Sequence, residues 1–569
     1  MSTSYDLSPL YRHSTSHFVP SSPPTLLSSH QSKLILRSTS TLQIIRTWSL
    51  VSSTSPGTFS ISISPSRTNP LVLAYHSKLA LAWVLDPDQD EPVAKVEIGK
   101  VDGCTGITWD NQGKTVLIWS ENHLRVSLFR LSDPTRVFHI QSPKSDSPEG
   151  YSFSSRYFAL LERHQNRDCI AIYDPQSPNW SLLRNIVIPD PTSDLVGLKW
   201  SPNGGKYLVA WSSITNYYLH IFTPDGRLIK TYTPPPDSPS SISLGIRQIE
   251  WSPSGQFLAI GGYDGKIKIL SKESNWQVVI VEFSTPVGGK IGNAKGKGKK
   301  GVNIWREPKT GWVEKTLGKG IIAFDQIEPS SRTPYLISND YVAPDPTKPF
   351  PKMGWFKLRW SIDGKWLVGY NQSYPTHLYI FQVLVPSPPS SSEHDPSPSS
   401  STTTPPRTLH LSPRLHTLII LNSPPKTFEF KPSASNSNSN ETLFILSGSK
   451  SFVVWTSPLF PPSSSSTTTT TTTLNSEGNQ EETDSTDNIG MVEGIGIPLA
   501  SESISFNPNQ LEFSPSPSQS EIYDEEEEAV LVGEKGGMFC LVYPVVGDQG
   551  KGNEGEGDRT WIEGGEDVC

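Results

Sequence analysis

One short phrase recurs along this 569-residue chain and limits its fold more than any other feature. An alternating apolar run ends in a large apolar anchor residue, then come Ser-Pro or a relative, a turn residue and often Gly, and then a second apolar run. The clearest copies end at Trp109, Trp200, Trp251 and Trp360, and weaker copies end at Ile63, Phe153, Phe430 and Phe506. The first five anchors lie 44 to 51 residues apart, slightly longer than the ~40–45-residue period of four-stranded propeller blades.

The residues between two copies follow a fixed order that predicts four strands. After Trp251 come an apolar run at 257–260, the pair Asp264-Gly265, an alternating run at 266–270 and a last apolar run at 276–283. Because Gly tolerates positive φ, the Asp-Gly pair suits a tight hairpin turn. A four-stranded sheet cannot bury both of its faces alone, so we expect the units to stack around an axis as an all-β propeller.

The number of units is the open point of this prediction. Eight anchors are present, and apolar runs at 25–29, 33–38 and 43–48 indicate a ninth unit near the start of the chain. Propellers typically have ~4–8 blades, so nine units imply a degenerate unit, two unequal rings or a miscount. We therefore predict seven to nine blade units in one ring or two. The final unit lacks an obvious last strand, and we expect residues near the N-terminus to close the ring.

Composition divides the chain into blade-forming parts and segments that cannot supply a packed core, being rich in Ser, Thr, Pro, Gly or acidic residues. We expect long disordered insertions in the latter. The predicted parts are an N-terminal arm (1–17), a first propeller part of about six units (18–285), a partly disordered Gly/Lys-rich insertion (286–350), a second propeller part (351–546) with loops at 386–406, 458–487 and 514–528, and an acidic Gly-rich tail (547–569).

Charge, cysteine count and hydropathy exclude several classes of protein. The net charge of −8 argues against a general nucleic-acid binder, which needs a basic face for phosphate. The four cysteines form no CxxC pair, which favours reduced thiols over a disulfide scaffold or zinc knuckle. No apolar run approaches the ~18 residues of a membrane span, and residues 1–24 lack the apolar core of a signal peptide. We therefore expect a protein of the cytoplasm or nucleoplasm with no membrane contact.

Few residues in the chain have the pattern of a chemical site. Gly113-Lys114-Thr115 ends like a phosphate loop, but the first Gly of that motif is replaced by Thr108. No spacing of His, Cys or carboxylates indicates a metal site or a catalytic set. We therefore predict no catalytic, cofactor-binding or metal-binding residue and no small-molecule substrate. The residues singled out are structural blade positions: Trp109, Trp200, Trp251 and Trp360 as core aromatics, with ligand stacking as the alternative, and Asp264 and Gly265 as turn formers.

One basic run allows two interpretations. Lysines occur among glycines at Lys290, Lys295, Lys297, Lys299 and Lys300. The first interpretation is a solvated, flexible loop. The second is a weak electrostatic contact, carried by the last four lysines, with an acidic surface such as tubulin tails or RNA.

The stretch 150–285 also resembles a known family. Ordered pieces that carry the resemblance are Ala159-Leu-Leu-Glu-Arg163, Trp180-Ser-Leu-Leu-Arg184, Pro224-Asp-Gly-Arg-Leu228 and the run from Ser243 to Lys266. They resemble the WRAP-type family of centrosomal and spindle-pole WD-repeat proteins, also called WD repeat-containing protein eight, in a fungal-like form. The chain lacks the Gly-His and Trp-Asp signatures of consensus WD repeats, so the blade count cannot be transferred from them.

That resemblance implies a non-enzymatic scaffold of the cytoskeleton. Family members are located at centrosomes or spindle pole bodies, which are microtubule-organising centres, and bind a coiled-coil anchoring protein. In fungi they act with that partner and a kinesin-14 class minus-end motor to anchor microtubule minus ends and support mitotic spindle assembly. Two alternatives remain open from the residues alone: a WD-repeat adaptor of a protein or RNA complex unrelated to the spindle, and a propeller enzyme that uses the central channel.

Overall fold

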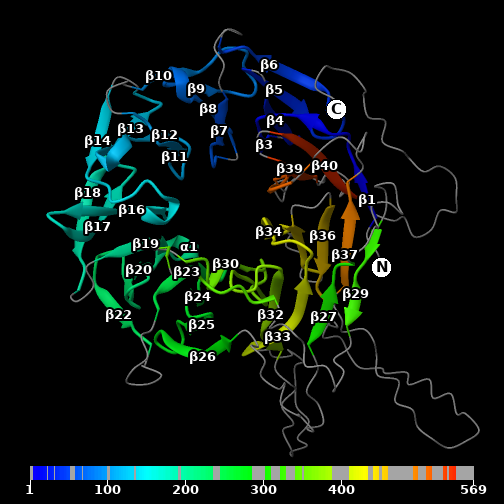
Figure 1. Cartoon of the computed structure of the whole chain (residues 1–569). Helices are drawn as coiled ribbons and strands as arrows, with labels where there is room; N and C mark the ends of the chain where they lie inside the picture. Colours follow the sequence, from blue (N-terminus) through cyan, green and yellow to red (C-terminus); the bar gives the residue numbers. More distant parts are fainter. Residues whose placement is uncertain are drawn as a thin grey trace, which may run out of the picture.

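A computed structural model shows the chain as one closed ring of nine radial sheets, or blades (Figure 1). Among the described residues there are nine blades, a count that lies within the predicted seven to nine. These blades form one ring and not two. The structure describes residues 4–21, 23–30, 32–51, 58–66, 68–98, 103–133, 136–189, 194–234, 244–284, 302–308, 321–327, 340–345, 347–348, 351–386, 409–432, 440–447, 451–458, 491–497, 506, 508–515, 529–534 and 537–545.

Blades 1 to 6 follow one another in the chain, and each is an antiparallel sheet of four strands from the channel outward. Their strands are β3 (Thr15–Val19), β4 (Thr25–His30), β5 (Lys33–Ser38) and β6 (Ile44–Trp48); β7 (Phe59–Ile63), β8 (Val72–His76), β9 (Leu81–Leu85) and β10 (Ala94–Glu97); β11 (Gly106–Trp109), β12 (Thr115–Trp119), β13 (Arg125–Arg130) and β14 (Val137–Gln141); β15 (Tyr151–Phe153), β16 (Phe158–His164), β17 (Arg167–Asp174) and β18 (Ser181–Val187); β19 (Leu195–Trp200), β20 (Leu208–Ser212), β21 (Leu219–Phe222) and β22 (Leu228–Tyr232); β23 (Ile246–Trp251), β24 (Phe257–Gly262), β25 (Lys266–Ser271) and β26 (Gln277–Ser284).

Blades 7 to 9 have the same inner order but carry additional strands. Blade 7 has β30 (Trp355–Trp360), β31 (Trp366–Asn371), β32 (His377–Pro386) and β33 (Leu409–Ile420), extended outward by β27 (Asn303–Arg306) and β29 (Asp325–Ile327). Blade 8 has β34 (Thr427–Phe430), β35 (Thr442–Leu446), β36 (Ser451–Thr456) and β37 (Met491–Gly496), extended by β28 (Ile321–Ala323). Blade 9 has β38 (Gln510–Phe513), β39 (Val530–Gly533), β40 (Met538–Val545) and β1 (Ser4–Leu7), and β2 (Tyr11–Arg12) also pairs with β40.

Helical structure among the described residues is limited to single turns: η1 (Ser77–Leu79), η2 (Glu121–His123), η3 (Pro148–Gly150) and α1 (Pro202–Gly205). In α1, Asn203 and Gly204 have positive φ, so this segment is a turn rather than a helix. Within the described part of the chain, helices of the length and hydropathy needed to cross a bilayer are absent.

The recurring serine has a defined role in the turn that joins the first two strands of a blade. Its hydroxyl accepts a hydrogen bond from the backbone N–H at or just before the start of the second strand, as Ser201 does from Tyr207 (3.1 Å), Ser252 from Phe257 (3.0 Å) and Ser361 from Trp366 (2.9 Å). In blade 3 the carboxylate of Asp110 accepts the equivalent bond. The glycine that follows takes positive φ, with +67° at Gly255, a conformation that L side chains rarely adopt.

The core of the molecule is divided into layers between blades. Nine clusters of buried apolar side chains are present among the described residues, and each lies at the interface of two neighbouring blades. Leu531 and Phe539 of blade 9 pack with Phe18 and Leu26 of blade 1, which completes the circle. Each blade therefore depends on both of its neighbours to bury its faces.

The chain ends meet in blade 9, which confirms the expectation that N-terminal residues close the ring. Ser4 to Leu7 pair antiparallel with Val545 to Val542 and supply the missing fourth strand. One weak copy was wrongly placed at Phe506, because the first strand of this blade is Gln510–Phe513. Ser514 is the turn serine, since its hydroxyl accepts the N–H of Ala529 at 3.0 Å.

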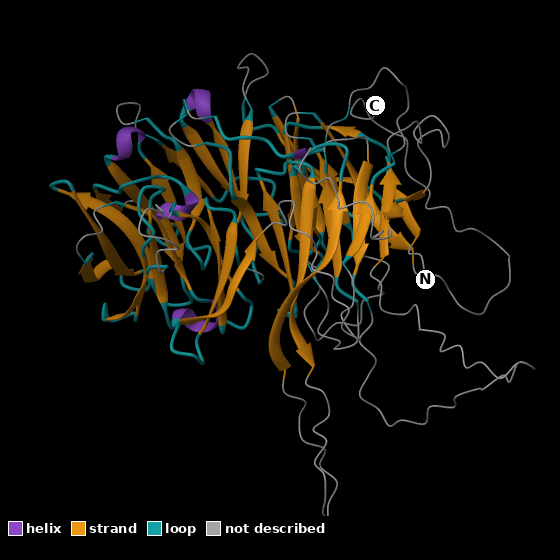
Figure 2. Cartoon of the chain, turned by 60° about the horizontal axis from the view of Figure 1, so that its bottom comes forward, coloured by secondary structure: helices purple, strands orange, loops and turns teal. Residues whose placement is uncertain are grey.

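The insertion, the loops and the tail predicted from composition differ in how far the structure describes them. The region 286–350 is more than an insertion, because β27, β28 and β29 within it add strands to blades 7 and 8. All but the first one or two residues of the expected loops 386–406, 458–487 and 514–528, and the whole tail 547–569, lie outside the described residues. The hairpin of β32 and β33 extends beyond the body of the ring (Figure 2).

Candidate binding site at the channel mouth

The anchor aromatics of the repeat all pack toward the preceding blade. Trp109 lies in the cluster between blades 2 and 3, Trp200 in that between blades 4 and 5, and Trp360 in that between blades 6 and 7. The indole of Trp109 donates to the carbonyl of Ser62 in the preceding inner strand (3.1 Å), and the indole of Trp360 donates to that of Glu250 (3.1 Å). Trp109 and Trp360 thus link their inner strands to the preceding ones by a hydrogen bond, and within the described residues the indoles of the other two tryptophan anchors contact the preceding blade by packing alone.

The residue that precedes each anchor has its side chain on the other face of the inner strand, since side chains alternate along a strand. In blades 5 to 8 this position holds ionisable residues of alternating sign: Lys199, Glu250, Arg359 and Glu429. In blades 2 to 4 it holds hydroxyl residues, Ser62, Thr108 and Ser152, and in blades 9 and 1 it holds Glu512 and His17. We call these nine residues the channel belt.

Neighbouring members of the channel belt pair with each other. Lys199 Nζ lies 2.7 Å from Glu250 Oε2, and Arg359 Nη1 lies 3.5 Å from the same oxygen. Arg359 Nε also contacts Glu429 Oε2 at 3.1 Å. The side chains are 17–39% exposed, so solvent screens these pairs only in part. These ion pairs therefore connect the inner strands of blades 5 to 8 to one another by direct contacts.

Lys357 is a further cation, beside this belt. Its Nζ lies 2.7 Å from Glu429 Oε1 and also donates to the carbonyl of Phe428 (3.1 Å). Burial lowers the pKa of this ammonium, and the attraction of Glu429 opposes that shift. Across the ring, His17 Nδ1 lies 3.0 Å from Glu512 Oε2, which joins blade 1 to blade 9.

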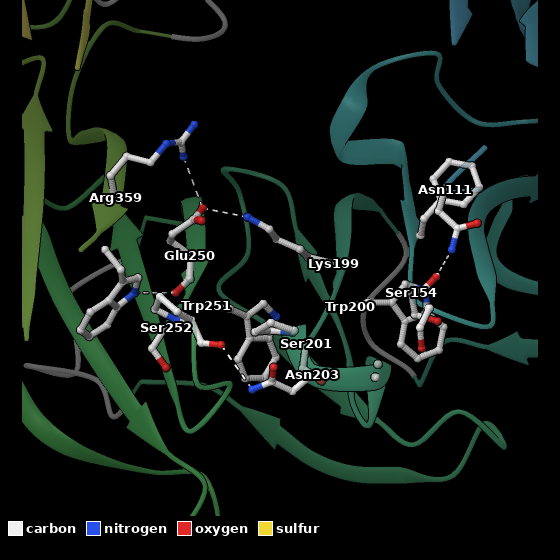
Figure 3. A pocket seen from close by; sticks show the side chains of 17 residues that line it. Asn111, Ser154, Lys199, Trp200, Ser201, Asn203, Glu250, Trp251, Ser252 and Arg359 are labelled. Atoms are coloured by element: carbon white, nitrogen blue, oxygen red, sulfur yellow. Dashed lines mark hydrogen bonds and ion pairs between the residues drawn. The ribbon is translucent and has the colours of Figure 1, made fainter. Parts of the chain in front are cut away.

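A cup of about 660 Å³ lies at the end of the inner strands where the turns begin. Its floor and walls come from blades 3 to 7 and include the anchors Trp200, Trp251 and Trp360 with the belt residues Lys199, Glu250 and Arg359. Figure 3 shows that Lys199 and Arg359 reach Glu250 from opposite sides. The cup thus spans several blades rather than a single loop.

Turn residues at the rim of the cup connect one blade to the next (Figure 3). Asn203 Nδ2 donates to the carbonyls of Ser254 (3.0 Å) and Pro253 (3.3 Å) in the following turn. Asn111 Nδ2 makes the equivalent bond to the carbonyl of Ser154. Because the rim is fixed by these bonds and the wall by ion pairs, the cup is a preformed surface.

The lining is suited to recognition of a polypeptide. Proline rings and backbone carbonyls offer apolar area together with hydrogen-bond acceptors, a composition typical of protein-binding surfaces. Among the lining residues that the structure describes, none is histidine or cysteine, and the ionisable side chains are occupied by each other.

The structure brings three of the six predicted blade positions together and separates the others. Trp200, Trp251 and Trp360 border the cup although they are buried (4–7% exposed), whereas Trp109, equally buried (4%) between blades 2 and 3, does not border it. Asp264 and Gly265 form the turn from β24 to β25, where Asp264 Oδ1 accepts the N–H of Lys266 (3.0 Å) and Gly265 O accepts the indole N–H of Trp355 (2.6 Å). The lysines at 295, 297, 299 and 300 lie outside the described residues.

The channel belt is the part of the site that sequence reasoning missed. Its signal was present, because the residue before the anchor reads Lys, Glu, Arg, Glu in four consecutive copies of the repeat. Alignment of the copies on their anchors shows this alternation of sign directly.

A second polar cluster lies in blade 4. Glu162, His164 and Cys169 each bring one possible metal-ligand atom within 4.8 Å of the others. The Tyr173 hydroxyl donates to Glu162 Oε1 at 2.6 Å, and His164 Nε2 lies 2.8 Å from Glu162 Oε2. Burial raises the pKa of the Cys169 thiol to about 11, and this thiol donates to the carbonyl of Glu162. The three residues form a hydrogen-bonded cluster, and the absence of a metal site stays a prediction.

Comparisons with known proteins find WD-repeat relatives of this chain. No protein-family model matches the chain. WD repeat-containing protein WRAP73 of Mus musculus is 31% identical over 373 residues, which cover 63% of this chain and 73% of the mouse protein. An uncharacterized WD repeat-containing protein of Schizosaccharomyces pombe is 25% identical over 199 residues, 35% of this chain and 39% of that protein.

Solved structures similar to this chain include two yeast proteins. The Saccharomyces cerevisiae protein Sqt1 has a TM-score of 0.42 at 9% identity over 86% of this chain and 96% of its own. Hsv2 of Kluyveromyces lactis has a TM-score of 0.34 at 12% identity over 67% of this chain and 94% of its own.

Proposed function

Because this chain belongs to the WRAP73 family of WD-repeat propeller proteins, we propose that it is a non-enzymatic scaffold that anchors microtubule minus ends at a microtubule-organising centre. The observation that carries the proposal is the 31% identity to mouse WRAP73 over 373 residues. The proposed location is the spindle pole body or centrosome, and the proposed outcome is support of mitotic spindle assembly.

The geometry of the ring supports a role in assembly. A propeller with nine buried inter-blade layers is a rigid body, and its rim and loops can hold several proteins at fixed distances. The cup adds a preformed concavity that presents the rings of Pro202 and Pro253 and turn carbonyls, and apolar area with hydrogen-bond acceptors suits a protein interface. We assign the cup to the contact with a partner polypeptide.

The proposed partners are a coiled-coil spindle-pole anchoring protein and a kinesin-14 class minus-end motor. Contact with the microtubule itself is indirect or weak. The lysines at 295, 297, 299 and 300 are the proposed contact with the acidic surface of the microtubule, since clustered positive charge attracts such surfaces at low salt. Their replacement by Gln is expected to reduce co-sedimentation with microtubules at low salt, and unchanged co-sedimentation would exclude this contact.

Affinity purification of the tagged full-length protein from mitotic cells tests the proposal. We expect recovery of a coiled-coil pole protein together with a minus-end kinesin. Recovery of neither, with RNA or metabolite turnover in the eluate, would reject the scaffold in favour of an RNA adaptor or an enzyme.

Two substitutions in one turn test the assignment of the cup. Pro253 and Gln256 are both exposed, but only Pro253 lines the cup. We expect Pro253→Glu to lower partner recovery about tenfold, because a buried unpaired carboxylate is costly at an interface. Gln256→Glu is the matched control and should bind as the parent does. Equal recovery with both variants would remove the cup from the contact while leaving the scaffold function intact.

A further inference from the structure

The outer edge of blade 4 is open and apolar. β18 is the outermost strand of this sheet, and within the described part of the chain it pairs only with β17. All of its side chains except Ile186 are exposed, with Leu182 at 52% and Val187 at 70%. Figure 1 places β18 at the periphery of the ring. A long edge strand with exposed apolar side chains is a template for pairing with another strand.

The same molecule shows how such an edge is filled. β27 pairs in parallel with β33 on the outer edge of blade 7, and β28 pairs antiparallel with β37 on that of blade 8. These added strands bury apolar side chains, since Ile304 is 3% exposed and Ile322 is 5% exposed. They are four and three residues long, so a short segment is sufficient. The outer edges of this propeller therefore accept a further strand.

Two other outer strands, β10 and β6, carry features that discourage pairing. β10 has only four residues and includes Lys95 and Glu97, and charges on a short edge strand oppose pairing. On β6, Arg46 is held by an ion pair with Asp90 of blade 2 at 2.7 Å. β18 has seven residues and a single charge, Arg184. A bulge opposite Ile172 and Tyr173 interrupts the pairing of β18 with β17, so β18 is regular only over residues 184–187. This regular part has four residues, the same length as β27.

The two faces of β18 differ in chemistry. Leu182 and Val187 pair with Tyr173 and Cys169, so they lie on the face toward blade 3. Arg184 pairs with Ile172 and lies on the face toward blade 5. A strand that pairs with β18 therefore needs apolar side chains on one face and an acidic side chain on the other, because cross-strand neighbours on one face interact.

We propose that β18 binds an extended segment of a partner protein as a fifth strand of blade 4, with apolar residues beside Leu182 and Val187 and a carboxylate beside Arg184. Backbone hydrogen bonds supply affinity in this mode, and alternate side chains supply specificity. The contact is small, so it is expected to be transient. It does not depend on the pole function and involves a different surface from the cup.

A second copy of the chain fits this edge less well. The antiparallel register that overlaps the whole of β18 has its twofold axis at Arg184, the central residue of the strand. That register places two guanidinium groups directly opposite each other, and like charges in that position are destabilising. A partner segment with a carboxylate at the same point avoids this repulsion.

A designed peptide tests the proposal with the full-length protein. The probe is fluorescein-labelled Lys-Thr-Val-Thr-Val-Glu-Val-Thr-Val-Lys, which has valines on one face and Glu on the other. We expect saturable binding by fluorescence anisotropy, weakened about tenfold by Val187→Lys through loss of apolar contact. Leu228→Lys on β22, the outer strand of blade 5, is the matched control, since Leu228 is also an exposed aliphatic residue on an outer strand; it should leave binding unchanged because it lies in another blade.

A charge exchange separates specific pairing from adhesion. Arg184→Glu should weaken binding of the Glu-containing peptide about fivefold. A second peptide, in which Lys replaces that Glu, should bind Arg184→Glu more tightly than it binds the parent protein. Equal binding by the parent and Val187→Lys, an equal loss with Leu228→Lys, or no change of preference with Arg184→Glu would overturn the proposal. A dimer of the full-length chain in light scattering that Val187→Lys dissociates would overturn it in favour of a second copy.

Discussion

At the residue scale, the anchor tryptophans differ in one hydrogen bond although they share a position in the repeat. The Trp109 indole N–H donates to the carbonyl of Ser62, whereas the N–H groups of Trp200 and Trp251 are buried with no partner in the described structure. Replacement by Phe keeps most of the apolar contact in every case. The cost of the substitution should therefore depend on whether a hydrogen bond is lost.

We expect Trp109→Phe to lower the free energy of unfolding by about 1 kcal/mol more than Trp200→Phe does, because only the first leaves a carbonyl without its donor. Urea unfolding followed by fluorescence measures both variants, and Trp360→Phe should behave like Trp109→Phe. Equal losses in the three variants would show that the indole bonds contribute nothing measurable.

Glu441 is the residue whose titration should alter stability near neutral pH. Burial, with the nearby Asp363 carboxylate, raises its pKa to about 7 from an ordinary value near 4.5. Between these values the folded protein binds the proton more tightly than the unfolded chain, so stability falls as pH rises from 5 to 7, by about 1 kcal/mol per pH unit. Glu441→Gln retains an acceptor for the Asp363 N–H and removes the charge.

The thermal midpoint of Glu441→Gln should therefore exceed that of the parent at pH 8 and should decline less between pH 5 and 8. Glu97→Gln, a change at a side chain that is 76% exposed, is the control and should keep the pH dependence of the parent. A parent-like slope in Glu441→Gln would contradict a buried carboxylate titrating near pH 7.

At the scale of elements, the sequence predicted strands well wherever the repeat was intact. The runs expected at 257–260, 266–270 and 276–283 overlap β24, β25 and β26, and those expected at 25–29, 33–38 and 43–48 overlap β4, β5 and β6. The reason is local: alternating apolar residues and a turn glycine determine these hairpins without help from distant parts of the chain.

Elements that depend on distant partners were not predictable in the same way. β27 and β28 are three- or four-residue strands, too short to show a pattern, and they exist because the edges of β33 and β37 accept them. The anchor of blade 9 was misplaced because Phe506 and Phe513 are followed by similar turn residues, and only pairing with β39 distinguishes them. The cup likewise needs turns from five blades, which no single repeat contains.

The closing strand β1 offers a test of the ring at this scale. Deletion of residues 1–9 removes four residues of pairing with β40 and the contacts of Tyr5 with Phe444 and Phe452, both at 6.1 Å between ring centres. We expect a loss of about 3 kcal/mol from these side chains and a thermal midpoint lower by several degrees. Deletion of residues 551–569, whose composition cannot form a core, is the control. An unchanged midpoint after the first deletion would mean that β1 does not stabilise the ring.

At the scale of the whole molecule, stability depends on an unbroken circle of nine interfaces. Blade 6 buries Phe257 and Ile267 against Trp360 and Phe381 of blade 7, and blade 1 buries Phe18 against Leu531 of blade 9. A chain divided between Asn293 and Ala294 would expose both of these layers on each half. Exposed apolar faces of that size favour reassociation or aggregation.

We therefore expect residues 1–293 and 294–569 to be insoluble or non-cooperative when expressed alone, and to co-elute as a 1:1 complex when expressed together. Size-exclusion chromatography and thermal unfolding of the complex give the measurement. A protease site inserted between the same two residues and cut after folding is the control, because it breaks the same bond in a ring that has already closed. The argument fails if either half purifies alone as a monomer with its own sharp unfolding transition, since such a half would bury its apolar faces without the neighbouring blades.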